Sequence, residues 1–404
     1  MLNPDRQPGS RNRGPDFCTV ALDRRRFLVV LGGAAALHAL GPTWAFARRV
    51  AHALPTLQPW SLPEVLPNGG LEAARALIGA AILAPSHWNA QPWRFEVDGG
   101  EVRLVLDAAR TLPADDPDQR FAQMSLGAAL ENLLVAARAW GQQPTVRYLP
   151  WGASPRAGAS LVAASVSWSP GEAAHDRALF AAIPARRSNP HAFDGRALPA
   201  ASRNQLQAQV GEEVRVHWLE DRGDLRAVGA LVHDAIEVVQ ADRRAQSDRQ
   251  RWLRDSERDA QGRGDGMTAE RLGLGGPARW FAGRSLDPNS RFYGWGAASL
   301  AKDVRDLVRG SGALALLTLP ARSPAGWIVG GQAYERFALR ATSLGLAQHP
   351  LSAPIQSERH RTLLARRFQA EGEEPLLLVR VGHAEPPPAT PRRGVALVST
   401  DRTS

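Results

Sequence analysis

Cysteine and lysine are almost absent from this chain of 404 residues. Cys18 is its single cysteine, so no disulfide forms within the chain and no cysteine-based metal or redox centre is expected. Lys302 is the only lysine, and nearly all of the 49 basic residues are therefore arginines, interspersed with acids. Because no block of five or six like charges occurs, the formal net charge of +9 predicts a solvated surface and no nucleic-acid partner.

Several motifs of common enzyme classes are also missing. The ten histidines show no HExxH or other metal-ligand spacing, and no GxSxG is present, which argues against a zinc enzyme or a serine hydrolase. Residues 273–276 (GLGG) resemble a dinucleotide loop only weakly, because no strand pattern precedes them. The sequence therefore predicts no metal site and gives no recognisable nicotinamide site.

The length and composition predict a globular protein of two domains, or of one domain built by duplication. A chain of 404 residues exceeds the usual size of one hydrophobic core. Hydrophobic residues make up 44% and charged residues 22%, which excludes wholesale disorder.

Residues 1–47 resemble a twin-arginine export signal. Arg24, Arg25 and Arg26 precede Phe27, and an apolar stretch rich in alanine and glycine follows at residues 29–40. This stretch is too short to cross a bilayer but suits a signal peptide, and residues 45–47 (AFA) suit its cleavage. We therefore expect recognition by the twin-arginine translocase, export to the periplasm or beyond, and a prosthetic group bound before export. The alternative is a buried N-terminal helix.

Two helical patterns share one skeleton, at residues 127–141 (GAALENLLVAARAWG) and 331–345 (GQAYERFALRATSLG). Small and apolar residues recur in both at helical spacing, and both end in a glycine. At a constant offset of 204 residues (331 − 127), identical residues stand at five pairs of positions: Gly127/Gly331, Ala129/Ala333, Glu131/Glu335, Ala137/Ala341 and Gly141/Gly345. Duplication explains the match, and chance similarity of two amphipathic helices is the alternative.

Helix and strand patterns alternate around this repeat, which predicts an α+β fold. Residues 71–83 predict a helix, and residues 94–97 and 101–106 predict a hairpin around Gly99 and Gly100. Further strands are expected at residues 161–168, 214–219, 313–319 and 376–381. Residues 150–159 predict a loop, residues 386–391 the start of a tail, and residues 243–300 a lid or insertion.

The strongest local signal is residues 84–95 (APSHWNAQPWRF). A helix ends at a Pro-Ser turn, and short polar groups follow before the next strand. Such a turn presents backbone N–H groups, a hydroxyl and an amide to the edge of a flat heterocycle. The alternative is an Asx-type turn whose polar groups satisfy only local backbone.

A second signal lies at residues 186–194 (RRSNPHAFD). Adjacent arginines and a hydroxyl after a helix suit a phosphomonoester dianion. Unpaired arginines at the end of a surface helix are the alternative.

These segments resemble the nitroreductase superfamily. Residues 84–95 look like its PSxxNxQPW element, which lines the FMN site, and residues 186–194 are similar to its RRSxRxF phosphate-binding segment. The helix at residues 327–345 and the segment after it resemble the family's helix and the loop that offers a backbone N–H to the flavin N5. Residues 380–382 and 391–393 resemble the family's C-terminal strand and the basic pair that reaches the phosphate.

The order of the elements resembles the Acg-type single-chain branch, because PSxxNxQPW comes before RRS. The resemblance implies a nitroreductase-like fold with central sheets flanked by helices, in which two fused halves imitate a dimer within one monomer. We expect a signal at residues 1–47, a first half at 48–170, a second half at 171–395 and a tail at 396–404. Two departures are Pro190, where the family has a second cation, and Phe193, one residue later than the pattern.

The resemblance also implies the site and its chemistry. We expect an exported FMN-dependent oxidoreductase that takes electrons from an unidentified donor and passes them to a small flat acceptor such as a nitroaromatic or quinone. The alternative is an FMN storage protein with little turnover. Ser352 and Ala353 are the expected catalytic positions, where a backbone N–H faces N5. The expected FMN-binding residues are Pro85, Ser86, His87, Asn89, Gln91, Arg186, Arg187, Ser188, Pro350, Leu351, Ser352, Ala353, Arg392 and Arg393.

Overall fold

The computed structural model describes residues 60–153, 160–172, 177–274 and 293–402. The expected export signal at residues 1–47 lies outside the described residues, as do parts of the loop at 150–159 and of the segment at 243–300. Among the described residues, no helix is long and apolar enough to cross a membrane.

The first sheet has five strands, and the predicted hairpin lies at its centre. Gly99 closes the hairpin with φ +60°, a backbone conformation that glycine adopts without strain. Alternate residues of the first hairpin strand, namely Trp93, Phe95 and Val97, face the core, as period-2 patterning requires. The strand order is β3-β4-β2-β1-β9, with bounds β1 Trp93–Asp98, β2 Glu101–Leu106, β3 Gln142–Tyr148, β4 Val162–Pro170 and β9 Ser399–Asp401.

The second sheet has four antiparallel strands in the order β5-β6-β8-β7. Its bounds are β5 Arg215–Leu219, β6 Ala313–Leu319, β7 Ala347–Leu351 and β8 Glu374–Gly382. Every residue of β6 is buried, because the sheet is covered on both faces. The four predicted strands at residues 161–168, 214–219, 313–319 and 376–381 are confirmed to within two residues at either end.

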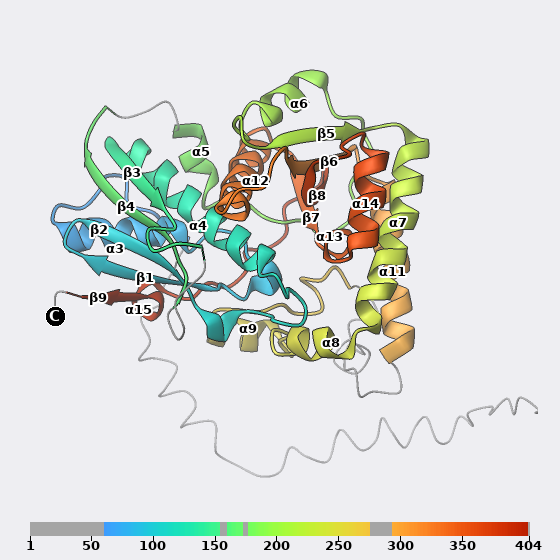
Figure 1. The fold of residues 1–404 in the computed structure, drawn as a ribbon, viewed down its shortest axis with the longest axis horizontal. Helices are drawn as coiled ribbons and strands as arrows, with labels where there is room; N and C mark the ends of the chain where they lie inside the picture. The colour runs from blue at the N-terminus through green and yellow to red at the C-terminus, as the bar shows by residue number, and fades with distance from the viewer. Residues whose placement is uncertain (1–59, 154–159, 173–176, 275–292, 403–404) are drawn as a thin grey trace, which may run out of the picture. The chain divides into compact units, whose positions relative to one another are not determined.

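The two repeat helices lie side by side between the sheets (Figure 1). They are α4, Arg120–Ala139, and α12, Gly326–Ser343. Gly127 of α4 faces the carbonyl of Ile328, and Gly331 of α12 faces the carbonyl of Met124, so closely that a Cβ at either glycine would overlap the opposite backbone. The same offset of 204 residues relates both members of each contact (331 − 127 and 328 − 124). Such reciprocity is the mark of a two-fold interface, here inside one chain.

The remaining helices surround this centre. α3 packs against α4 in the first half, and α7 packs against α11 in the second. Their bounds are α3 Gly70–Ala81, α5 Arg177–Ala182, α6 Ala200–Gln207, α7 Arg222–Ala241, α8 Arg243–Gln250, α9 Glu257–Arg263, α11 Tyr293–Arg309, α13 Ala353–Gln356, α14 Glu358–Arg367 and α15 Val395–Val398, with 3-10 turns η1 His87–Asn89 and η2 Ala108–Arg110. The α+β class is confirmed.

Two expectations for the chain's later segments are wrong. Residues 347–351, expected in a loop, form strand β7, because they pair with β8 along the edge of the second sheet. Residues 396–404, expected to be a tail, contribute β9, which pairs in parallel with β1 of the first sheet. The end of the chain thus returns to the first half. The boundary expected near residue 170 stays a prediction, and β1–β4 precede it while β5–β8 follow it.

Candidate functional site

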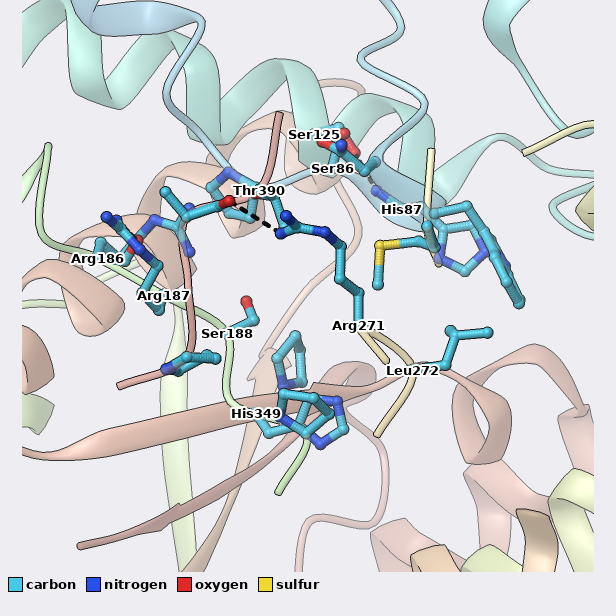
Figure 2. A pocket seen from close by; sticks show the side chains of 18 of the residues that line it. Ser86, His87, Ser125, Arg186, Arg187, Ser188, Arg271, Leu272, His349 and Thr390 are labelled. Carbon is cyan, nitrogen blue, oxygen red and sulfur yellow. Dashed lines mark hydrogen bonds between the residues drawn. The ribbon is translucent and has the colours of Figure 1, made fainter. Parts of the chain in front are cut away.

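A cavity of about 590 Å³ is lined by residues from both halves of the chain. Its volume is that of a typical small-molecule site. Figure 2 shows Ser86, His87 and Ser125 on one side, with Arg186, Arg187 and Ser188 opposite and Arg271 extending into the space between them. Ten of the fourteen expected residues line it: Pro85, Ser86, His87, Asn89, Arg186, Arg187, Ser188, Pro350, Ser352 and Arg392.

The Pro-Ser segment turns sharply as it enters the cavity wall. Trp88, Asn89 and Gln91 have φ values of 53°, 51° and 54°. Residues other than glycine rarely adopt this backbone conformation. The hydroxyl of Ser86 accepts a hydrogen bond from the Gln91 N–H at 3.0 Å, which fixes the turn. This tightly wound backbone is stored strain of the kind that clusters at functional sites.

Two of the expected motif residues hold the cavity wall together. Asn89 donates to the carbonyls of Gly266 and Pro391 and accepts from Arg392. Gln91 is fully buried, donates to Gly264 O at 2.7 Å and accepts from the Arg393 N–H at 3.0 Å. Gln91 does not line the cavity, because its amide bonds to the backbone of two other segments, and its expected contact with FMN stays a prediction.

Arg393 is also outside the cavity lining. Its guanidinium donates to the carbonyls of Gln91 and Trp93 and so ties the C-terminal segment to β1. Burial lowers its pKa to about 10, with a further contribution from Arg110. The expected basic pair therefore divides into one residue at the cavity, Arg392, and one that fixes the backbone behind it.

Arg186 and Arg392 are buried at one end of the cavity. Both donate to the carbonyl of Leu83 at the end of the α3 segment. The Nη1 of Arg186 and the Nε of Arg392 are buried and have no hydrogen-bond partner among the described residues. Burial lowers the pKa of Arg392 well below its usual value, and the neighbouring Arg186 and Arg187 lower it further. An anion bound here would satisfy these donors and stabilise both charges.

Arg271 brings another cation to this end of the cavity. It reaches the carbonyl of Ala389 at 3.0 Å, and its charge contributes to lowering the pKa of both Arg187 and Arg392. Pro190 lines the cavity where the resemblance leads us to expect a cation. Sequence reasoning missed Arg271, because it lies 85 positions from Arg186 (271 − 186) in a segment without a recognised motif.

The arginines outnumber their acidic partners. Arg186 is 3.2 Å from the carboxylate of Glu335, and Arg271 forms an ion pair with Glu257 at 2.5 Å. No carboxylate lies within ion-pair distance of Arg187 or Arg392 in the described part of the chain. Two positive charges thus remain, which a phosphomonoester dianion would balance.

Trp60, which was not among the expected site residues, stacks on two of these arginines. The guanidinium of Arg187 lies 4.4 Å from the centre of its ring, and that of Arg392 lies 5.2 Å from it. The indole face favours both cations electrostatically. Burial, followed by the charges of Arg186 and Arg271, lowers the pKa of Arg187 to about 10.

The expected N5 loop has a different structure. Pro350, in β7, and Ser352, after its end, line the cavity. Leu351 packs into the hydrophobic core around the second sheet. Ala353 is the first residue of α13 and packs against the same core, so neither side chain lines the cavity. The Leu351 side chain faces away from the cavity because alternate residues of a strand face opposite sides, and its expected contact with FMN stays a prediction. The role of the Ser352 and Ala353 N–H groups stays a prediction.

Part of the segment at 243–300 forms a wall of the cavity. Glu257, Gln261, Glu270, Arg271 and Leu272 line it. This wall is held to the rest of the chain by hydrogen bonds from Asn89 to Gly266 and from Gln91 to Gly264.

The described residues hold no group of three or more histidine, cysteine, aspartate or glutamate side chains arranged for a metal ion.

Comparisons with known proteins assign the family. No family model matches the sequence. The chain is 30% identical over 340 residues to "Putative NAD(P)H nitroreductase Rv3131" of Mycobacterium tuberculosis, covering 81% of this chain and 91% of that protein. It is 34% identical over 101 residues to "Putative NAD(P)H nitroreductase acg" of the same organism, covering 25% of this chain and 29% of that protein.

Among solved structures, the FMN-dependent nitroreductase NfnB from Mycobacterium smegmatis, in complex with NADPH, matches 55% of this chain and 97% of its own. The sequence identity is 16% and the TM-score is 0.35. Because this score is low, the assignment rests on the sequence relatives. The first of these relatives matches most of this chain and most of its own length. The chain therefore belongs to the nitroreductase superfamily.

Proposed function

We propose that the cavity binds FMN and that the protein is an FMN-dependent oxidoreductase of nitroreductase type. The observation that carries this proposal is the surplus of buried guanidinium groups at one end of a cavity of suitable volume. Arg186, Arg187 and Arg392, with the Ser188 hydroxyl, would hold the phosphate. Ser86 and His87 lie across the cavity from Arg186 and Arg187 (Figure 2), and Asn89 lies next to Arg392; these three residues would hold the flavin ring and ribityl chain.

FMN supplies two-electron transfer when it is bound. The chain's residues position it and exclude water from its surroundings. Phe121, Met124, Met267 and Leu272 give the cavity an apolar lining, which suits a flat acceptor such as a nitroaromatic or quinone. The names of the relatives make NAD(P)H the donor to test first.

We further propose that the protein is exported folded through the twin-arginine pathway, with FMN already bound, and works as a monomer. Paired arginines, a short apolar stretch and an AFA cleavage motif within residues 1–47 support export. Fusing the signal to a reporter tests it. The reporter should reach the periplasm, and replacing Arg24 and Arg25 by lysines should stop it.

An absorption spectrum of the purified protein tests the cofactor. We expect a yellow protein with a bound flavin, and a chain that stays colourless after incubation with FMN would overturn the proposal. The rival function is FMN storage. Chemical reduction without oxygen, followed by mixing with a quinone, separates the two: rapid reoxidation supports the enzyme, whereas a flavin unreactive to every acceptor supports the store.

A further inference from the structure

His87 forms a short hydrogen bond to a buried carboxylate that sequence reasoning did not single out. Its Nε2 is 2.7 Å from Oδ2 of Asp115, and both Asp115 oxygens are buried. The two residues are 28 positions apart and meet because the Pro-Ser turn packs against the start of α4. The backbone N–H of His87 donates to the Ser125 hydroxyl of that helix at 3.3 Å.

Asp115 is held as a carboxylate. Burial alone would raise its pKa, but the hydrogen bond and charge of His87, together with Arg249, outweigh burial and hold the pKa at about 2. Arg249 donates to Oδ1 at 2.5 Å, and the Gln356 amide donates to the same oxygen at 2.8 Å. An ionised carboxylate only accepts hydrogen bonds, so the Nε2 of His87 carries a proton and donates it.

The other ring nitrogen is left available. No hydrogen bond to Nδ1 of His87 is found within the described residues, and the ring lines the cavity. The Phe121 ring stacks on the imidazole with centres 4.8 Å apart and an angle of 26° between the planes. Carboxylate, aromatic ring and backbone bond together fix the orientation of His87. A histidine that served only to fill space would need none of them.

We propose that His87 is the proton donor to the acceptor and that Asp115 is its positioning residue. This inference rests on the proposed function. Reduction of a quinone to a hydroquinone needs one hydride and one proton, and reduction of a nitro group to a nitroso group and water needs the same. Bound, reduced FMN would supply the hydride. The proton passes from Nδ1 of protonated His87 to the acceptor oxygen, and water then reprotonates Nδ1, while Nε2–H stays bonded to Asp115.

Two acceptors separate proton delivery from electron delivery. Benzoquinone needs a proton, whereas ferricyanide takes electrons without one. In His87→Gln, the rate of reoxidation of the reduced flavin by benzoquinone should fall by roughly 100-fold relative to the rate with ferricyanide, because roughly 100-fold is the usual contribution of a general acid. If both acceptors slow equally, His87 only shapes the site and the proposal fails.

A matched control and a rescue complete this test. His233→Gln makes the same change in another histidine–carboxylate pair, with Glu237 at 3.5 Å on a helix outside the cavity lining, and should alter neither rate. In His87→Ala, added imidazole should restore the benzoquinone rate. Absence of rescue, in a variant that still binds FMN and still reacts with ferricyanide, would count against proton donation.

A third measurement does not need the flavin. In the FMN-free protein, ¹⁵N NMR of the histidines should show neutral His87 protonated at Nε2, and Asp115→Asn should remove this preference. Finding the proton on Nδ1 would overturn the proposed geometry. If wild type binds no FMN, the proposed function fails at the spectrum. If it binds FMN and reduces quinones equally well without His87, only this inference fails.

Discussion

Glu131 and Glu335 occupy equivalent positions on the two repeat helices and are both fully buried, yet their surroundings differ. Glu131 accepts from Arg336 at 2.8 Å and from the Gln332 amide at 2.9 Å. Glu335 has Arg186 at 3.2 Å, and neither of its oxygens has a hydrogen-bond partner among the described residues.

The difference shows where the duplication kept its symmetry and where it was lost. The glycine contacts of α4 and α12 are reciprocal, because both helices must approach equally closely. Around the carboxylates the halves diverge. Oε2 of Glu131 accepts two hydrogen bonds from α12, although its Oε1 has no hydrogen-bond partner among the described residues, while Glu335 lies against Arg186, which lines the cavity. Packing preserves the two-fold relation, and the proposed ligand site breaks it.

The largest effect is expected at the symmetric contact. Gly127→Ala and Gly331→Ala each place a methyl group against the backbone of the opposite helix, which cannot move aside as a side chain can. We expect each to lower the free energy of unfolding by ~3 kcal/mol, and by similar amounts, measured by chemical denaturation.

The control for this pair is Gly79→Ala in α3. A Cβ there meets only a methyl group of Val395, at 4.0 Å, so this variant should be neutral or stabilised by up to ~1 kcal/mol. If Gly127→Ala and Gly331→Ala differ by more than their errors, the contact is not as symmetric as the backbone indicates.

The next effect concerns the pH dependence of stability at the asymmetric pair. Burial, aided by the charge of Glu131 and opposed by Arg186 and Arg392, raises the pKa of Glu335 from 4.5 to about 7. The folded state therefore binds more protons than the unfolded state between these values, and stability falls as pH rises through this window. The stabilisation is fully present below pH 4.5, and ~3 kcal/mol of it is lost by pH 7.

Glu335→Gln removes the titrating group, so its unfolding free energy should lack this decline between pH 4.5 and 7. Denaturation of wild type and variant at intervals across that window measures the difference. Glu131→Gln is the equivalent change in the other half. It should keep most of the decline, because burial is the main cause of the raised pKa of Glu335, but the decline should be smaller, because the charge of Glu131 contributes to that pKa. A parallel pH course for wild type and Glu335→Gln would contradict the assignment.

The third comparison sets Arg186 against Arg336, the arginine partners of the two carboxylates. Arg186→Met removes a buried charge that lines the cavity and should weaken FMN binding by roughly 2–3 kcal/mol, or 30- to 150-fold. Arg336→Met removes the partner of Glu131 and should leave FMN affinity unchanged while lowering stability. Flavin fluorescence titration measures both, and equal losses of affinity would show that the site extends across the helix pair.

The sequence predicted much of this fold because periodic patterns report local structure. The hairpin, four further strands and both repeat helices follow from patterning, and the repeat anticipated the α4–α12 contact. Strand β9 was missed, since three residues are too few for a pattern and their pairing is non-local. Strand β7 was missed because its segment resembles the family's loop after the long helix, and its pairing with β8 shows only in the structure.

The site was predicted as far as its motifs extended. Ten expected residues line the cavity, whereas Gln91 and Arg393 turned out to fix backbone, which only their partners' positions reveal. Asp115 and Arg271 were missed because each reaches the site through contacts far apart in the chain. Trp60 was missed for the same reason, and it gives the smallest of the expected effects.

Trp60 stacks on two arginines of the cavity, while Trp151 stacks on Arg103, at 5.6 Å, in the first sheet. Trp60→Ala loses the attraction between the indole face and the guanidinium groups, and it lets water reach Arg187 and Arg392. FMN affinity should fall by about 0.5–1 kcal/mol, or roughly 2- to 5-fold, in a flavin fluorescence titration. Trp151→Ala removes the same kind of contact away from the cavity and should leave affinity unchanged. Equal affinities for wild type and Trp60→Ala would mean that the arginines keep their positions without the ring, and that the two tryptophans are equivalent in spite of their different places in the fold.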